Sequence, residues 1–125
     1  MPRVLDVGQC GYDHGSIARH LKASYGAEVT GADSMGQALV SLRAGEFDLV
    51  LVNRIFDGDG TKGIDLIRAI KADSELAQVP VMLVSNYPEA QDEAKELGAL
   101  PGFGKGDLRV GRSVATLDAA LSRAV

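Results

Sequence analysis

Several features that stabilise or target small proteins are missing from this sequence. It has no tryptophan and a single cysteine, Cys10, in 125 residues, so no internal disulfide can form. One cysteine and two histidines are too few for a structural zinc site, and we expect no bound metal. No apolar run is long enough to span a bilayer, and the N-terminus lacks a signal-peptide pattern. We therefore expect a cytoplasmic protein that makes no membrane contact.

Positive charge is scarce as well. Lysine and arginine number 13 against 17 aspartates and glutamates, the formal net charge is −4, and the basic residues form no cluster. This balance lacks the electrostatic footprint of nucleic-acid binding. Glycine, by contrast, is frequent, with 15 residues that indicate many tight turns. At this length the chain can bury a core as one domain, 1–125, and we expect no tag and no second domain.

One apolar stretch of the chain lies in residues 47–53. An apolar run begins after Asp48, ends at the polar Asn53, and is followed by a glycine-rich loop as far as Gly63. This pattern is typical of a buried parallel strand, whose last side chain reaches the carboxyl edge of an open α/β sheet, where ligands bind. The side chain that we expect at this edge is the amide of Asn53.

Four further strands and five helices complete the pattern. We expect strands at 4–7, 28–33, 79–84 and 100–103, and the weakly apolar strand at 28–33 is expected at the sheet edge. Helices are expected to begin at Asp13 or Ser16, Ser34, Gly63, Pro88 and Ser113, with Gly26, Gly45 and Gly98 ending the first, second and fourth. The alternation predicts an α/β fold, a doubly wound five-stranded parallel sheet with helices on both faces.

The first connection, Gly8 to Gly15, allows a second interpretation. A glycine-rich loop before a helix can cradle a phosphate, but such turns are common in α/β folds and we favour an ordinary turn. Cys10 is expected to be an unreactive loop residue, because no catalytic partners can be placed beside it. We expect His14 to lie in the same loop and His20 on a helix face.

Taken in order, these segments resemble the receiver domains of two-component response regulators. The resemblance covers essentially the whole chain and is strongest from Gly63 through Ser85, which is similar to the family's third helix and fourth strand. Gly98-Ala99 followed by Lys105 matches the spacing into the family's lysine. The resemblance implies a flavodoxin-like sheet with strand order 2-1-3-4-5.

The resemblance also implies a site at the carboxyl edge of the sheet. Active receivers transfer a phosphoryl group from a histidine kinase to an aspartate that ends the third strand, beside an acid pair that holds Mg²⁺. Ser85 matches the switch hydroxyl of the family, and Lys105 matches its lysine. The acceptor position, however, is Asn53, and the acid-pair positions are Gly8 and Gln9. The loop after Asn53 is also longer than usual, and Gly106 stands where the family usually has proline.

These departures all affect the chemistry. The lone pair of an amide nitrogen is delocalised, so Asn53 cannot be the nucleophile that a carboxylate is. Gly8 and Gln9 offer Mg²⁺ no anionic oxygen, and without the metal little neutralises a transferring phosphoryl group. We therefore interpret the chain as a degenerate pseudo-receiver, not an enzyme, with no catalytic residue and no Mg²⁺ or other cofactor. We expect Asn53 to hold the site in one fixed state through hydrogen bonds to Lys105 or Ser85. The alternative is that Asn53 is a neutral relic.

Three other acids are candidates to replace the missing acid pair as metal ligands. Asp57 and Asp59 lie in the glycine-rich loop and are expected to be surface turn residues. Asp6 stands in the middle of a buried strand and needs a hydrogen-bonding partner whatever its role. We expect Lys105 to contact one of these three acids or to turn towards solvent.

The function predicted from these observations is signalling by protein–protein contact without phosphorylation. The partner would be a kinase or a downstream regulator that docks on the fourth helix, fifth strand and fifth helix, around Leu97, Leu108 and Arg112, and a homodimer remains open. A second hypothesis keeps phosphorylation at Asp57 or Asp59, or the binding of an anion or metal. A third, more distant one is a methyltransferase that binds S-adenosylmethionine, which residues 4–8 and 29–33 also resemble. The spacing of its glycines and the number of strands argue against it.

Overall fold

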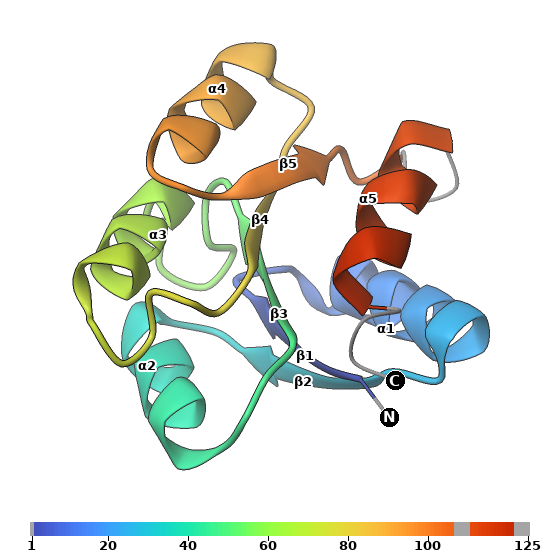
Figure 1. Ribbon diagram of the computed structural model, residues 1–125, viewed down its shortest axis with the longest axis horizontal. Coiled ribbons are helices and arrows are strands. Elements are labelled where there is room, and N and C mark those ends of the chain that lie inside the picture. Colours follow the sequence, from blue (N-terminus) through green and yellow to red (C-terminus); the bar gives the residue numbers. More distant parts are fainter. Residues whose placement is uncertain (1, 107–110, 122–125) are drawn as a thin grey trace.

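The computed structural model describes residues 2–106 and 111–121 and has the predicted α/β architecture (Figure 1). The sheet is parallel throughout, with strand order β2-β1-β3-β4-β5, so the predicted fold class and strand order are confirmed. The strands are β1 (Arg3–Val7), β2 (Glu28–Ala32), β3 (Leu49–Asn53), β4 (Val81–Val84) and β5 (Leu100–Phe103).

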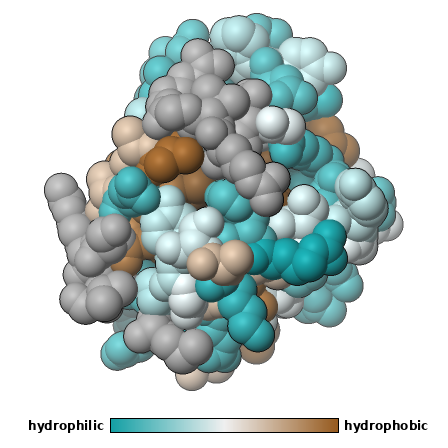
Figure 2. Space-filling view, turned by 90° about the vertical axis from the view of Figure 1, so that its right-hand side faces the viewer, coloured by the Kyte–Doolittle hydropathy of each residue, from teal (hydrophilic) through white to brown (hydrophobic). Residues whose placement is uncertain are grey.

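Five helices connect the strands and cover both faces of the sheet. They are α1 (Gly11–Tyr25), α2 (Met35–Ala44), α3 (Gly63–Ala72), α4 (Pro88–Glu96) and α5 (Gly111–Leu121). Helices α1 and α5 lie on one face, and α2, α3 and α4 lie on the other (Figure 1). The face of α1 and α5 is mostly hydrophilic, with hydrophobic side chains reaching the surface in small patches (Figure 2). Among the described helices, none is long and apolar enough to cross a membrane.

The core has two parts because successive side chains of a strand point to opposite faces of the sheet. Leu49 and Leu51 of β3 pack towards α1 and α5, whereas Val50 and Val52 pack towards α2, α3 and α4. All five residues of β3 are buried, as expected for a central parallel strand covered on both sides. Strand β2 has a mostly exposed or half-buried pattern and lies at the edge of the sheet, as predicted.

The helix starts differ from the sequence prediction at two places. Helix α1 begins at Gly11, and its N-cap is Cys10, whose Sγ accepts a hydrogen bond from the backbone N–H of Asp13 at 3.4 Å. The prediction of Asp13 or Ser16 as the cap was wrong because a thiol is an uncommon capping group. Helix α5 begins at Gly111, two residues before the predicted Ser113. The predicted cap of α2 is confirmed, since Ser34 Oγ accepts from the N–H of Gln37 at 3.2 Å.

Candidate functional site

The residues that matched a receiver site lie around one hollow at the carboxyl edge of the sheet. This hollow has a volume of about 240 Å³. Its lining includes Asn53 at the end of β3, Ser85 just after β4, and Lys105 in the loop after β5. The fold therefore gathers the three residues as predicted, because the carboxyl ends of parallel strands meet at the same edge.

Asn53 is held by main-chain carbonyls and not by the predicted side chains. Its buried Nδ2 donates to the carbonyl oxygen of Gly8 at 3.0 Å and to that of Ile55 at 2.7 Å. The expectation of hydrogen bonds to Lys105 or Ser85 is corrected here. Because both amide hydrogens point at carbonyl oxygens, this position requires a donor, which an ionised carboxylate cannot provide.

Phe56 fills the space beside Gly8. The glycine has φ +80°, and a Cβ placed on it would lie 2.3 Å from Cδ1 of the phenyl ring. Phe56 itself is fully buried. Gly8 can therefore adopt this backbone conformation and leave room for the Phe56 ring, which a residue with a side chain could not do. The missing acid at this position is visible in the sequence, but the aromatic ring beside it is not.

The loop between β3 and α3 is fastened onto the end of β1. Asp57 N–H donates to the carbonyl oxygen of Gly8 at 2.9 Å, which adds to the bond from Asn53. Within the loop, Phe56 N–H donates to the carbonyl of Thr61 at 2.8 Å, and Gly60 N–H donates to the carbonyl of Phe56 at 2.9 Å. The extra loop length predicted from the sequence thus forms a compact turn that carries Phe56 over β1.

Lys105 contacts an acid other than the three predicted as its partners. Its Nζ lies 2.8 Å from Oδ2 of Asp13, in the first turn of α1. The expectation that Lys105 would contact Asp6, Asp57 or Asp59 was wrong, whereas the other alternative, that it turns towards solvent, agrees with its 40% exposed side chain. The error follows from the misplaced helix start, since Asp13 reaches Lys105 from a helix that begins at Gly11. The ammonium group of Lys105 also lowers the pKa of Asp13.

Ser85 is buried and makes a local contact. Its Oγ accepts a hydrogen bond from the N–H of Tyr87 at 3.1 Å, two residues further on. Arg54, which directly follows Asn53, was not singled out from the sequence, yet it also lines the hollow. Its guanidinium carbon lies 4.6 Å from the centre of the Tyr87 ring, a cation–π geometry. Among the described residues, the lining of the hollow therefore includes two cations, Arg54 and Lys105, and no carboxylate.

Asp6 has the partner that its burial required. Its Oδ2 lies 2.8 Å from Nδ1 of His14. This histidine belongs to α1, whereas the sequence prediction placed it in a loop. Asp6 Oδ1 and both polar atoms of the Gln9 amide are buried without a hydrogen-bond partner among the described residues. Burial raises the pKa of Asp6 to about 6, although His14 and, more weakly, Gln9 pull it down.

The other two candidate acids stay at the surface. Asp57 and Asp59 are exposed, and Asp59 Oδ1 accepts from the N–H of Thr61 at 2.9 Å, which helps to lower its pKa. In the part of the chain that the structure describes, no three histidine, cysteine, aspartate or glutamate residues are placed to share a metal ion. The loop predicted from Gly8 to Gly15 is shorter than expected, because residues 11–15 are helical. This leaves too few loop residues for the phosphate cradle considered above.

The donors at the acid-pair positions do not fit a Mg²⁺ ion. Mg²⁺ is bound in proteins by carboxylates and water in a nearly octahedral shell. Gly8 contributes no side chain, and the ring of Phe56 takes the adjoining space. Gln9 contributes only an uncharged amide. The acid-pair positions, Gly8 and Gln9, thus lack the anionic oxygens on which the metal chemistry of a receiver would depend.

The buried Asp6 predicts an unusual pH dependence. Its pKa rises from 3.8 to about 6 on folding, so its contribution to stability is greatest at low pH and declines as the pH rises through this window. We expect Asp6→Asn, which can still hydrogen-bond His14, to increase the free energy of unfolding by ~1–3 kcal/mol near about pH 8 and by much less near about pH 4.

Urea denaturation of the wild type and the Asp6→Asn variant at several pH values measures this difference. Asp57→Asn is the matched control, because it removes an exposed carboxylate from the same edge of the molecule. A gain for Asp6→Asn that stays constant from acid to neutral pH would show that the Asp6 carboxyl does not titrate in this window.

Together, the strand order and the site define the fold of response-regulator receiver domains. A receiver protein from Pseudomonas putida aligns with a TM-score of 0.78 and 22% identity, covering 94% of this chain and 96% of that one. A response regulator from Thermotoga maritima aligns with a TM-score of 0.76 and 22% identity, covering 98% of both chains. At these identities the likeness establishes the fold.

The sequence comparison is more local. The chain is 39% identical over 54 residues to the chemotaxis protein CheY-3 of Vibrio cholerae. The matched segment spans 43% of this chain and 40% of that protein. No family model matches the sequence.

Proposed function

We propose that this chain is a receiver-like module of two-component signal transduction that acts through protein–protein contacts without being phosphorylated. The receiver fold and the local similarity to a chemotaxis CheY protein support the signalling role. The proposal that the chain is not phosphorylated rests on the contacts of Asn53. Its amide donates to two main-chain carbonyls where a receiver would hold its phosphoacceptor.

The whole edge is arranged in a way that does not depend on a phosphoryl group. Lys105, which the resemblance assigns to contact that group, is paired with Asp13 at 2.8 Å. The loop after β3 is tied to Gly8, with Phe56 packed beneath it. A site that is already closed by contacts within the chain has no strong driving force to change conformation on phosphorylation.

The surface for the partner, a kinase or a downstream regulator, is the face formed by α4, β5 and α5. Tyr87 at the start of α4 and Leu100 at the start of β5 are exposed on it, and Leu97 is half-buried. Exposed aromatic and aliphatic side chains of this kind are frequent at the centre of protein interfaces. Of the other residues expected there, Leu108 and the side chain of Arg112 lie outside the described part of the chain.

The proposal is tested by adding Mg²⁺ and beryllofluoride, a mimic of a protein-bound phosphoryl group, to isotopically labelled protein. We expect the amide signals of Asn53, Ser85 and Lys105 to stay in place, because the acceptor position carries an amide and the described residues contain no cluster that could hold a metal ion. Concerted shifts of these signals together with those of α4 and β5 would indicate a working receiver switch and would overturn the proposal.

A second candidate function is the binding of a small anion at the same edge. It is favoured by the two cations, Arg54 and Lys105, that line the hollow together with Ser85 and Asn53. An anion that binds the folded state alone raises the melting temperature. We would therefore compare melting curves in phosphate and in chloride at equal ionic strength. A melting temperature that does not depend on phosphate concentration argues against this candidate.

Two further alternatives have weaker support. Phosphorylation at Asp57 or Asp59 would use exposed carboxylates, and among the described residues neither belongs to a cluster that could hold a metal ion. A methyltransferase role would need a cofactor loop before α1, but Cys10 already caps that helix and Gly11 and Gly15 lie within it.

A further inference from the structure

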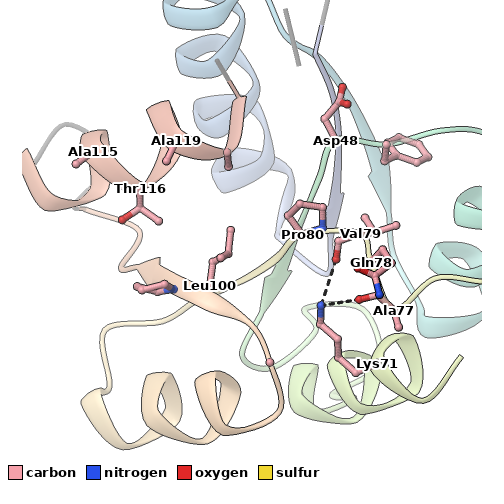
Figure 3. Close-up of a pocket in the computed structure, with 14 residues that line it drawn as sticks. Asp48, Lys71, Ala77, Gln78, Val79, Pro80, Leu100, Ala115, Thr116 and Ala119 are labelled. Atoms are coloured by element: carbon pink, nitrogen blue, oxygen red, sulfur yellow. Dashed lines mark hydrogen bonds between the residues drawn. The ribbon is translucent and has the colours of Figure 1, made fainter. Parts of the chain in front are cut away.

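A second and larger hollow opens at the opposite edge of the sheet, where β4 and β5 begin (Figure 3). Its volume is about 910 Å³, which lies within the range of small-molecule sites. Pro80 precedes β4 and Leu100 begins β5, so the hollow lies at the amino edge of the strands, away from Asn53. The proposed signalling function assigns no ligand to this hollow, although Leu100 also belongs to the proposed docking face.

The walls of this hollow are mainly apolar. On one side, α5 presents the small residues Ala115 and Ala119, whose methyl groups leave open space that a larger side chain would fill. In Figure 3, Thr116 and Ala119 point from α5 towards Leu100. Leu100 is 36% exposed and, together with Pro80, forms the apolar surface opposite the helix.

Lys71 supplies a cation to the lining from the last turn of α3. Its Nζ donates to the carbonyl oxygens of Ala77 at 3.0 Å and Val79 at 3.4 Å, which fix the ammonium group against the turn before β4 (Figure 3). Those two bonds leave one of its three N–H groups for another acceptor. Among the described residues, no carboxylate forms an ion pair with Lys71, and burial lowers its pKa.

The other charged group of the lining, Asp48, is placed differently. Its Oδ2 accepts a hydrogen bond from the N–H of Arg3 at 2.8 Å, so its charge is partly compensated. In Figure 3, Asp48 and Lys71 lie on opposite sides of Pro80. An anionic group at Lys71 would therefore meet a cation without facing Asp48 directly. The hollow thus combines mainly apolar walls with the fixed and partly desolvated positive charge of Lys71.

We propose that this hollow binds an amphiphilic carboxylate, with the carboxylate on the free N–H of Lys71 and the apolar chain between α5 and Leu100. A carboxylate complements the ammonium group, and a charge-assisted hydrogen bond in a partly buried site is stronger than one in water. The apolar body would cover Leu100 and Pro80, and the burial of these surfaces supplies the rest of the affinity. This site does not involve Asn53 or a phosphoryl group, but it shares Leu100 and α5 with the proposed docking face.

The test uses sodium octanoate as the probe, below its micellar concentration, and amide spectra of the labelled full chain as the readout. We expect saturable shifts at Lys71, Val79, Leu100 and Ala119. Octanamide, which has the same chain and a neutral head, should bind at least about tenfold more weakly because it lacks the charge-assisted bond.

Three variants locate the two halves of the site. Lys71→Met should weaken octanoate binding about tenfold or more, whereas Lys71→Arg should retain most of it. The arginine variant keeps the test decisive if the methionine variant does not fold. Ala119→Leu should weaken binding by narrowing the space between α5 and Leu100, with Ala23→Leu on the exposed face of α1 as its control.

Three results would overturn the proposal. The first is the absence of saturable shifts with octanoate in the wild type. The second is equal affinity for octanoate and octanamide, which would show that the charge of Lys71 does not contribute to binding. The third is a shift of the same signals with protein concentration alone, which would identify a second copy of the chain as the occupant of the hollow.

Discussion

Replacing Gly8 with alanine is expected to destabilise the protein by ~2–5 kcal/mol, since two costs coincide at this residue. The backbone has φ +80°, which an L-residue with a side chain rarely adopts. The new methyl group would also lie 2.3 Å from Cδ1 of Phe56, and the buried ring cannot move aside freely. Urea denaturation followed by far-UV circular dichroism measures the loss.

Gly60→Ala separates the two costs. Gly60 has a similar φ of +72°, but no atom lies within 4 Å of the position where its Cβ would be. We expect this variant to lose only ~1–2 kcal/mol, the cost of the backbone conformation. In a Phe56→Val background, the further loss caused by Gly8→Ala should fall towards the Gly60 value. Equal losses for Gly8→Ala and Gly60→Ala would refute the packing role of Phe56.

Asn53→Asp, the change that restores an acceptor carboxylate, is expected to cost ~3 kcal/mol or more near neutral pH. The carboxylate would face the carbonyl oxygens of Gly8 and Ile55, now 3.0 and 2.7 Å from the donating nitrogen, without any hydrogen to give them. Lys105 and Arg54 line the same hollow, but each is already engaged, with Asp13 and with the ring of Tyr87.

The pH dependence of Asn53→Asp identifies the cause of its loss. A protonated carboxyl can donate one hydrogen bond, so the folded state should raise the pKa of the new side chain. The stability of the variant relative to wild type should therefore fall as the pH rises from acid to neutral. Asn86→Asp, at an exposed position that lines the same hollow, is the control and should change stability little. A variant at position 53 as stable as wild type at neutral pH would contradict the assigned contacts.

The fold was predictable because local signals and overall architecture agree along most of this chain. The buried run from Leu49 to Asn53 and the weaker strand at Glu28–Ala32 indicated the centre and the edge of the sheet. The one large error in helix boundaries was the start of α1. A cysteine side chain caps this helix, and the sequence pattern gives such a cap little weight.

The composition of the site was also predictable, but its contacts were not. The order of the strands brings Asn53, Ser85 and Lys105 to one edge whatever their side chains do. Which atoms they bind depends on the path of the loop that carries Phe56 and on the first turn of α1. Both depend on packing between segments that are far apart in the sequence. The local pattern around Asn53 therefore gave no signal for the ring beside Gly8 or for the Lys105–Asp13 pair.

The two hollows divide the molecule into edges of different character. The carboxyl edge carries the polar residues that match receiver positions, and Asn53 and the loop after β3 are hydrogen-bonded there to the backbone. The amino edge is open, largely apolar and positively charged at Lys71. A ligand at the amino edge would contact α5 and β5, two of the three elements of the proposed docking face. Binding there offers a physical route by which a small molecule could modulate a partner without phosphorylation.

The most direct test of the central claim is the intact mass of the protein after incubation with acetyl phosphate and Mg²⁺. A receiver with a working acceptor gains one phosphoryl group from such a donor, whereas we predict that this chain keeps its original mass. A stable gain of one phosphoryl group would contradict the account. Loss of that gain in Asp57→Asn or Asp59→Asn would then assign the phosphorylation to the loop after β3.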